Sequence, residues 1–412
     1  MKKLFGISLI MAGIALAVML SGCSAADFRY DYPSAADGRY DADIAPGEME
    51  SGADAIYGES GKDDANGDGN NSSGIVTAGE WNDIANWDYW IKLLNNQDWA
   101  GYGKYYSFYP RIFAYVELTD GSEAPVCGVK VVLMKDQKKV WEAVSDNTGH
   151  AALWATLTED VYKVDATGYT VQVAGKEYQD FEFTTPNDSE VKVNKYTVAS
   201  NKVDNAIDVA FIVDATGSMG DEIGFLKADL KDIIDLVGKQ CNAKVRTGTV
   251  FYRDEGDDYI TRHSQFTDNV SETIKFIGKQ EASGGGDWEE AVHKALEAGV
   301  QTLGWNLSAK SRVAFMILDA PPHHEDAIIA SCQQSIAQYA KMGIKIIPVS
   351  ASGIDKGTEY LLRSFAMGTN GTYVFITNHS GVGNEHIEAT VGEYQVEKLR
   401  DLIARLIIAY AK

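Results

Sequence analysis

Apolar and polar residues alternate over short runs between residues 111 and 200. This alternation is typical of strands that bury one of their two faces. We expect strands at 111–118, 128–134, 139–143, 151–157 and 169–173. Turn-forming residues such as Asp120-Gly121 separate these runs. Short strands with regular turns between them predict a β-sandwich.

From residue 207 onward, apolar runs alternate with amphipathic helices. The apolar runs predict strands at 207–213, 245–252, 313–318, 344–349 and 373–376. Helices are expected at 223–237, 288–303, 327–341, 360–367 and 394–410. Strands that are apolar on both faces are typical of a parallel sheet with helices on either side. The pattern therefore predicts a doubly wound, mainly parallel α/β domain over residues 205–412.

Aromatic residues are dense just before the expected sandwich. They include Trp81, Trp87, Trp90, Trp99, Tyr102, Tyr105, Tyr106 and Tyr109. We expect them to close the core of a small domain over residues 81–200. The alternative is a surface on which sugars or proteins stack. Residues 124–153 resemble the prealbumin-like or carboxypeptidase-regulatory-like sandwiches of secreted proteins, which implies a spacer or a second binding module.

The N-terminus carries the features of an export signal. Two lysines precede an apolar stretch over residues 4–20, as in a secretory signal peptide. The following Leu20-Ser21-Gly22-Cys23 resembles the bacterial lipobox. That resemblance implies removal of residues 1–22, acylation of Cys23 and a lipid-anchored protein of the bacterial cell envelope. Ser24 after the cysteine favours the outer membrane. An uncleaved transmembrane helix fits less well because the apolar run is short.

The charge of the chain limits its partners. With 37 basic and 59 acidic residues, the formal net charge is −22. Nucleic acids bind to clustered Lys and Arg, so we expect no nucleic-acid partner. Between Ser24 and Glu80, thirteen acidic residues accompany only three basic ones, and Gly, Ala and Ser are frequent. Residues 23–80 are therefore expected to form a disordered acidic linker.

Three loops of the α/β domain offer oxygen ligands. In such domains, ligands bind at the carboxyl ends of the parallel strands. The loops there contain Asp214-Ala215-Thr216-Gly217-Ser218, Asp319 and Gly284-Gly285-Gly286-Asp287. Carboxylates and hydroxyls suit a hard dication such as Mg²⁺, with Mn²⁺ or Ca²⁺ as alternatives. A turn that only caps the next helix uses the same residue types without an ion.

Asp214-x-Thr216-x-Ser218 resembles the D-x-S/T-x-S signature of the metal-ion-dependent adhesion site in von Willebrand factor type A domains. The resemblance covers about residues 205–411. It implies that Thr216 and Ser218 bind the metal directly and that Asp214 and Asp319 complete the charge. It also implies that the ion bridges to an Asp or Glu carboxylate of a protein partner. The family usually has a Thr in the middle loop, where Asp287 stands here. Asp287 either joins the metal ligands or caps the following helix.

The run His323-His324-Glu325-Asp326 offers another set of ligands. A zinc hydrolase could use such residues, with the Glu as a base. Adjacent histidines, however, point in different directions on most backbones. We therefore expect His323 and His324 to lie on the rim of the metal site. Asn378 and His379, which follow the last strand, are expected to join that rim.

These observations favour a lipid-anchored envelope protein that binds a protein partner through a metal ion and catalyses no reaction. Two alternatives stay open. In the first, the chain is an envelope scaffold whose metal only stabilises loops. In the second, His323 and His324 act in a zinc hydrolase.

Overall fold

The computed structural model describes residues 76–377 and 388–412, which fall within one compact unit. The predicted signal peptide, Cys23 and most of the expected acidic linker lie outside the described residues, as do Asn378 and His379. None of the helices in the described part is both long and apolar enough to span a bilayer.

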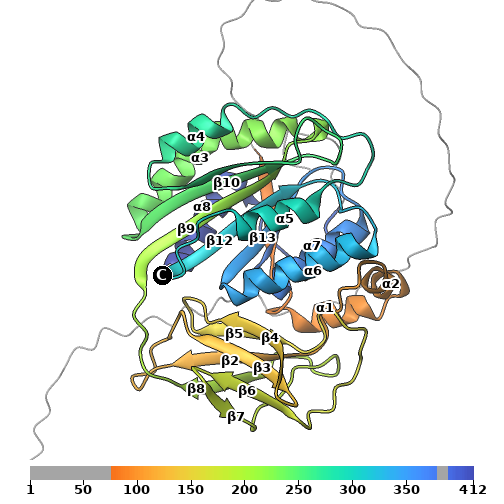
Figure 1. Cartoon of the computed structure of the whole chain (residues 1–412), viewed down its shortest axis with the longest axis vertical. Helices are drawn as coiled ribbons and strands as arrows, with labels where there is room; N and C mark the ends of the chain where they lie inside the picture. Colours follow the sequence, from red (N-terminus) through yellow and green to blue (C-terminus); the bar gives the residue numbers. More distant parts are fainter. Residues whose placement is uncertain (1–75, 378–387) are drawn as a thin grey trace, which may run out of the picture. The chain divides into compact units, whose positions relative to one another are not determined.

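An eight-stranded sheet forms the centre of the α/β domain (Figure 1). Five of its strands run parallel in the order β10-β9-β12-β13-β14. Antiparallel strands complete the two edges, β11 beside β10 and β1 followed by β15 beside β14. The bounds are β1 (Thr77–Trp81), β9 (Asp204–Asp214), β10 (Lys244–Tyr252), β11 (Thr261–Thr267), β12 (Ala309–Leu318), β13 (Ile344–Ser350), β14 (Tyr373–Ile376) and β15 (Glu397–Lys398).

Helices cover both faces of this sheet (Figure 1). Val209, Phe211 and Val213 of β9 pack in one core with α3 (Gly220–Gln240) and α8 (Leu399–Ala411), and α4 (Val270–Ile277) lies beside α3. Ala210 and Ile212 point to the opposite core, with α5 (Val292–Gln301), α6 (Asp326–Lys341) and α7 (Lys356–Gly368). Successive side chains of a strand point to opposite faces, so a strand covered on both sides must be apolar throughout. The predicted doubly wound, mainly parallel fold is confirmed.

The hydrophobic pattern of the sequence did not predict two edge strands of the sheet. The residues of β11 are largely polar and partly exposed. Strand β1 falls within the expected linker, yet Ala78 pairs with Ile376 of β14. The linker prediction was therefore wrong for residues 77–80, because the partner strand that orders them lies almost 300 residues further along the chain.

The β-sandwich lies between α2 and β9 in the sequence and contains two sheets, β5-β2-β8 and β4-β3-β6-β7. Its strands are β2 (Phe113–Thr119), β3 (Lys130–Lys135), β4 (Lys138–Val144), β5 (His150–Trp154), β6 (Tyr169–Val173), β7 (Lys176–Tyr178) and β8 (Val193–Thr197). All five predicted strands are present. Because β1 precedes the sandwich and β9 follows it, the sandwich is an insertion into the α/β domain.

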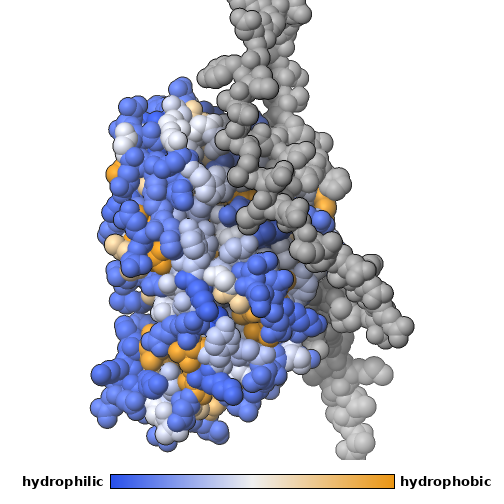
Figure 2. Space-filling model, turned by 90° about the vertical axis from the view of Figure 1, so that its right-hand side faces the viewer, coloured by the Kyte–Doolittle hydropathy of each residue, from blue (hydrophilic) through white to orange (hydrophobic). Residues whose placement is uncertain are grey.

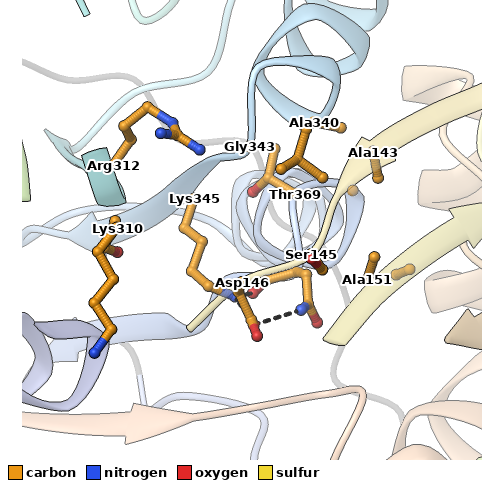
Figure 3. A pocket seen from close by; sticks show the side chains of 15 residues that line it. Ala143, Ser145, Asp146, Ala151, Lys310, Arg312, Ala340, Gly343, Lys345 and Thr369 are labelled. Atoms are coloured by element: carbon orange, nitrogen blue, oxygen red, sulfur yellow. Dashed lines mark hydrogen bonds and ion pairs between the residues drawn. The ribbon is translucent and has the colours of Figure 1, made fainter. Parts of the chain in front are cut away.

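A small cavity marks the contact between the sandwich and the α/β domain (Figure 3). Its volume of about 20 Å³ has room for about one water molecule. Beside it, Lys345 of β13 forms an ion pair with Asp146 at 2.8 Å. Asn370 donates a hydrogen bond to the same carboxylate oxygen at 3.1 Å. These contacts form a polar interface between the sandwich and the α/β domain. The cavity beside them is too small for an organic ligand.

The aromatic segment forms α1 (Trp87–Leu94) and α2 (Gln97–Tyr106), which lie beside α7. The rings of Trp90 and Trp99 lie 5.4 and 6.0 Å from the ring of Tyr360 on α7. Both tryptophans are buried, which confirms the predicted core role, whereas Tyr105 is 47% exposed. The core that they close includes a helix of the α/β domain and is not confined to residues 81–200.

Polar residues dominate the face drawn in Figure 2, as the net charge of −22 leads one to expect. Hydrophobic residues appear there in separate patches, several of them over the lower part, where the sandwich lies. Scattered exposed hydrophobic residues are normal for soluble domains.

A buried ion cluster fixes the aromatic segment to α7. The Arg363 guanidinium donates two hydrogen bonds to Asp83, at 2.9 and 2.5 Å, and one to Glu359 at 3.2 Å. All three side chains are at most 1% exposed. Desolvation opposes the charge of Arg363, but the two carboxylates outweigh it and raise the pKa of this guanidinium.

Replacing Arg363 with Met should destabilise the fold severely, because Asp83 would stay buried without a cation and Glu359 would keep only Lys356. Removal of one partner from a buried ion pair costs about 3–5 kcal/mol. Urea unfolding followed by circular dichroism measures the difference. Lys92→Met is the matched control, since it removes an exposed partner of Asp88 at 3.0 Å and should cost no more than about 0.5 kcal/mol. Equal effects of the two substitutions would contradict the role of the cluster.

Candidate metal centre

Two carboxyl groups meet at the carboxyl edge of the sheet. Asp214 is the last residue of β9, and Asp319 directly follows β12. The two strands are parallel neighbours, with Val213 opposite Ile317, so both carboxyl groups lie at the same edge. Burial and the nearby charge of Asp319 raise the pKa of Asp214 to about 7. The structure thus brings together the two acids that the sequence predicted for one site.

The turn after β9 is organised by Asp214 itself. Its Oδ1 accepts hydrogen bonds from the backbone N–H of Thr216 at 2.9 Å and from the Thr216 hydroxyl at 2.7 Å. Helix α3 begins after Met219 and has no side-chain cap. The alternative in which residues 214–218 only cap a helix therefore does not describe this turn.

The second carboxylate oxygen of Asp214 forms no hydrogen bond in the described part of the chain. This atom, Oδ2, is buried. The Tyr252 hydroxyl, from the end of β10, lies close enough to act to lower the pKa of this carboxyl, although it too has no hydrogen-bond partner in the described part of the chain. A buried polar atom without a partner costs about 1–3 kcal/mol. The turn therefore presents an acceptor that a cation can satisfy.

Ser218 and Asp319 are the other two residues that the sequence predicts as ligands. Burial raises the pKa of the Asp319 carboxyl, although a hydrogen bond with the Ser218 side chain acts to lower it. Ser218 is exposed, whereas Asp214 and Thr216 are buried. The four residues predicted as ligands, Asp214, Thr216, Ser218 and Asp319, hence lie at one edge of the sheet, and the exposed Ser218 is on the solvent side.

The structure adds two acids that the sequence analysis missed. Burial, followed by the charges of Asp214, Asp254 and Asp319, raises the pKa of Glu290 to about 9. Burial, with the charge of Asp319 as a smaller cause, raises the pKa of Glu222 to about 7. The helix expected at 288–303 would include Glu290 in its first turn, but α5 begins only at Val292.

Backbone hydrogen bonds hold the loop of Glu290 against the metal centre. Gly217 N–H donates to the carbonyl of Gly284, and Ser283 N–H donates to the carbonyl of Ala215. The φ angle of Gly285 is 73°, and a Cβ atom there would lie 2.8 Å from Glu290 Oε1. Only glycine permits both this backbone conformation and this approach.

Among the described residues, no lysine or arginine pairs with the buried acids of this edge. In the described part of the chain, Asp214, Glu222, Glu290 and Asp319 form no ion pair. Arg253, which follows β10, donates instead to the backbone carbonyls of Ala215 and Glu281. Carboxylates, hydroxyls and an unpartnered oxygen make a donor set that suits a hard dication. The residues present therefore fit the predicted metal.

Asp287 was expected either to join the ligands of the metal or to cap the following helix. It does not cap α5, whose N-cap is Ala291. Its carboxylate instead lies in a group with Asp254 and His323, in which one ligand atom from each residue lies within 4.8 Å of the others. Asp254 had not been singled out from the sequence, because it follows β10 without any recognisable motif.

The two adjacent histidines point to different partners. His323 Nε2 lies 2.7 Å from Asp254 Oδ1, and the ring of His324 stacks on Tyr105 at 3.7 Å. Burial acts to lower the pKa of His323, but the hydrogen bond and the charge of Asp254 outweigh it and raise that pKa. His323 and His324 therefore do not form a joint site.

Comparison with known proteins identifies the α/β domain. Residues 208–381 match the family model described as von Willebrand factor A domain. A putative ariadne-like RING finger protein from Acanthamoeba polyphaga mimivirus is 34% identical over 119 residues, which are 29% of this chain and 11% of that protein. An alpha-protein kinase from Dictyostelium discoideum is 30% identical over 132 residues, which are 31% and 21% of the two chains. The chain thus spans only a small part of these curated relatives.

Solved structures give more distant matches. A von Willebrand factor type A protein from Catenulispora acidiphila shares 14% identity, with 74% of this chain and 50% of that chain covered and a TM-score of 0.33. Proximal thread matrix protein 1 from the mussel byssus shares 15% identity, with 51% and 47% covered and a TM-score of 0.34. The family match, taken with the mostly parallel sheet and its flanking helices, shows that the chain contains a von Willebrand factor A domain.

Proposed function

We propose that this chain binds a protein partner through a divalent cation held by Asp214, Thr216, Ser218 and Asp319. The observation that carries the proposal is the buried Asp214 carboxyl, which faces Asp319 without any neutralising lysine or arginine in the described part and keeps one oxygen unpartnered. The ion would be Mg²⁺, with Mn²⁺ or Ca²⁺ as alternatives, since all four donors are oxygens.

The open side of the centre favours an external ligand. The exposed Ser218 lies at the rim, so a bound ion could accept a carboxylate from an Asp or Glu of the partner. Burial raises the pKa of Glu290 to about 9, so this carboxyl is held mostly protonated near neutral pH, whereas Glu222, with a pKa of about 7, is about half protonated there. In its protonated form Glu290 adds no negative charge that would repel the partner's carboxylate. Binding of this kind makes and breaks no covalent bond.

The proposal places the domain in the bacterial cell envelope. Its support is the sequence Leu20-Ser21-Gly22-Cys23, which fits lipid anchoring at Cys23. The acidic residues that follow would keep the domain away from the bilayer.

A scaffold with a purely structural metal is the second candidate. The complete burial of Asp214 favours it, because an ion there would hold three loops together whether or not a partner adds a ligand. Partner binding would then survive removal of the metal wherever the fold survives.

Asp214→Asn should abolish Mg²⁺ binding while keeping the volume of the side chain. Loss of even an outer-shell partner typically weakens metal affinity about 10–100-fold, so a direct carboxylate should matter at least as much. Isothermal titration of purified protein measures the affinity, and pull-down from envelope extract with and without EDTA measures partner binding. Asp235→Asn, an exposed change on α3 away from the site, is the control and should bind as the wild type. Unchanged Mg²⁺ affinity in Asp214→Asn would refute the metal centre, and EDTA-resistant capture would identify the scaffold.

The metal-free protein should lose stability as the pH rises from about 4 to about 9. The pKa of Asp214 is about 7 in the folded chain against an ordinary 3.8, and that of Glu290 is about 9 against 4.5. The folded state therefore binds more protons than the unfolded state in this window, and its free energy of unfolding falls with rising pH. Thermal unfolding across this range measures the effect. The increase in Tm on adding Mg²⁺ should be larger near the alkaline end.

The matched variant for this effect is Asp214→Asn, which should flatten the pH dependence of the metal-free protein. A metal-free Tm that rises between mildly acidic and mildly alkaline pH would contradict the assignment of these buried acids.

A further inference from the structure

A second group of ligands lies beside the metal centre. Asp254 follows β10, Asp287 precedes α5 and His323 follows β12, and one ligand atom of each lies within 4.8 Å of the others. We propose that Asp254, Asp287 and His323 hold a second, transition-metal dication of the Zn²⁺ type. This site goes beyond the proposed function, since it uses none of the four ligands assigned to the first ion.

The exposure of the three ligands fits a site that an ion can reach. Asp254 is 7% exposed, His323 is half-buried and Asp287 is exposed. One wall of the site is therefore within the protein, and the other faces solvent. Three protein ligands with the remaining positions open to water is a common arrangement for Zn²⁺.

The loops that carry these ligands are already fixed to one another. The Asp257 carboxylate accepts a hydrogen bond from the N–H of Asp254 at 3.2 Å and one from the N–H of Gly285 at 2.9 Å. Asp254 and the loop of Asp287 are thereby positioned by one group. The 2.7 Å hydrogen bond between His323 Nε2 and Asp254 Oδ1 positions the third ligand. A metal ion would replace the shared proton of that bond.

Independent support comes from two buried side chains beside the group. Glu290 Oε2 and His293 Nδ1 have no hydrogen-bond partner in the described part of the chain, and both residues are 4% exposed. The charge of Asp254 acts on Glu290, and that of His323 acts on His293. Unsatisfied buried groups of this kind are rare in folded proteins, and here they offer polar atoms beside the proposed ion.

The donor set selects the metal. An imidazole nitrogen with carboxylate oxygens suits Zn²⁺, whereas Mg²⁺ prefers oxygen ligands alone. The first centre offers only oxygens and the second includes His323, so the two sites should discriminate between the two ions. Asp287 and Glu290 share one loop, so an ion bound to Asp287 would also order the loop that brings Glu290 to the first centre.

The test is a titration of the untagged, metal-free full chain with Zn²⁺ in excess Mg²⁺, which fills the oxygen-only centre. The wild type should take up one equivalent of Zn²⁺. His323→Ala and Asp287→Asn should each weaken this uptake at least about tenfold. Asp214→Asn, which disables only the first centre, should retain it.

His324→Ala is the matched control, because its ring stacks on Tyr105 and does not face the group. It should keep the full equivalent of Zn²⁺. Asp287 is exposed, so its variant is expected to fold, and circular dichroism verifies this. The proposal is overturned if the wild type takes up no Zn²⁺, if Asp287→Asn and His323→Ala bind as the wild type does, or if His324→Ala loses the ion equally.

Discussion

The burial of two neighbouring carboxyl groups sets the chemistry of one edge of the central sheet. The parallel pairing of β9 with β12 brings Asp214 and Asp319 to adjacent positions. Neither strand can move away, because each is buried between helices on both faces of the sheet. Burial raises the pKa of both carboxyl groups, and the charge of Asp319 raises that of Asp214 further. The cost of burying these charges can be relieved by protons or by a cation. A proton satisfies one oxygen, whereas a dication satisfies donors from several loops together.

The glycine-rich loop before α5 couples this edge to its neighbourhood. Gly284 lies so close to Asp257 that a Cβ atom there would be 2.4 Å from a carboxylate oxygen. The same loop brings Glu290 to the first centre and Asp287 to the second group. Its lack of side chains therefore allows one short segment to approach both groups of acidic residues. Both groups follow strands of one buried sheet, and a scaffold of this kind can position the residues of its loops.

The segments outside the α/β domain brace it from one side. Arg363 on α7 is held by Asp83 from the aromatic segment, and Trp154 of the sandwich donates a hydrogen bond to the carbonyl of Met367 at the end of α7. Since β1 also belongs to the central sheet, the sandwich is inserted between two parts of one folding unit. The aromatic helices and the sandwich thus share one hydrophobic core with the α/β domain. The ring of Tyr105 also stacks on His324, which lies in the loop after β12.

The sequence by itself determined the alternation of strands and helices, the sandwich strands, the turn from Asp214 to Ser218 and the position of Asp319. These features depend on local periodicity or on residues next to a strand end, so a short window of sequence contains the information. Only the tertiary structure decided which distant residues join them. Strand β1 pairs with β14, and the polar strand β11 pairs with β10. Glu290 and Asp254 can be recognised as candidate site residues only from their charged neighbours on other loops. Asp287 shows the same limit, because its carboxylate is directed by the path of a glycine-rich loop, and glycines leave that path open until tertiary contacts fix it.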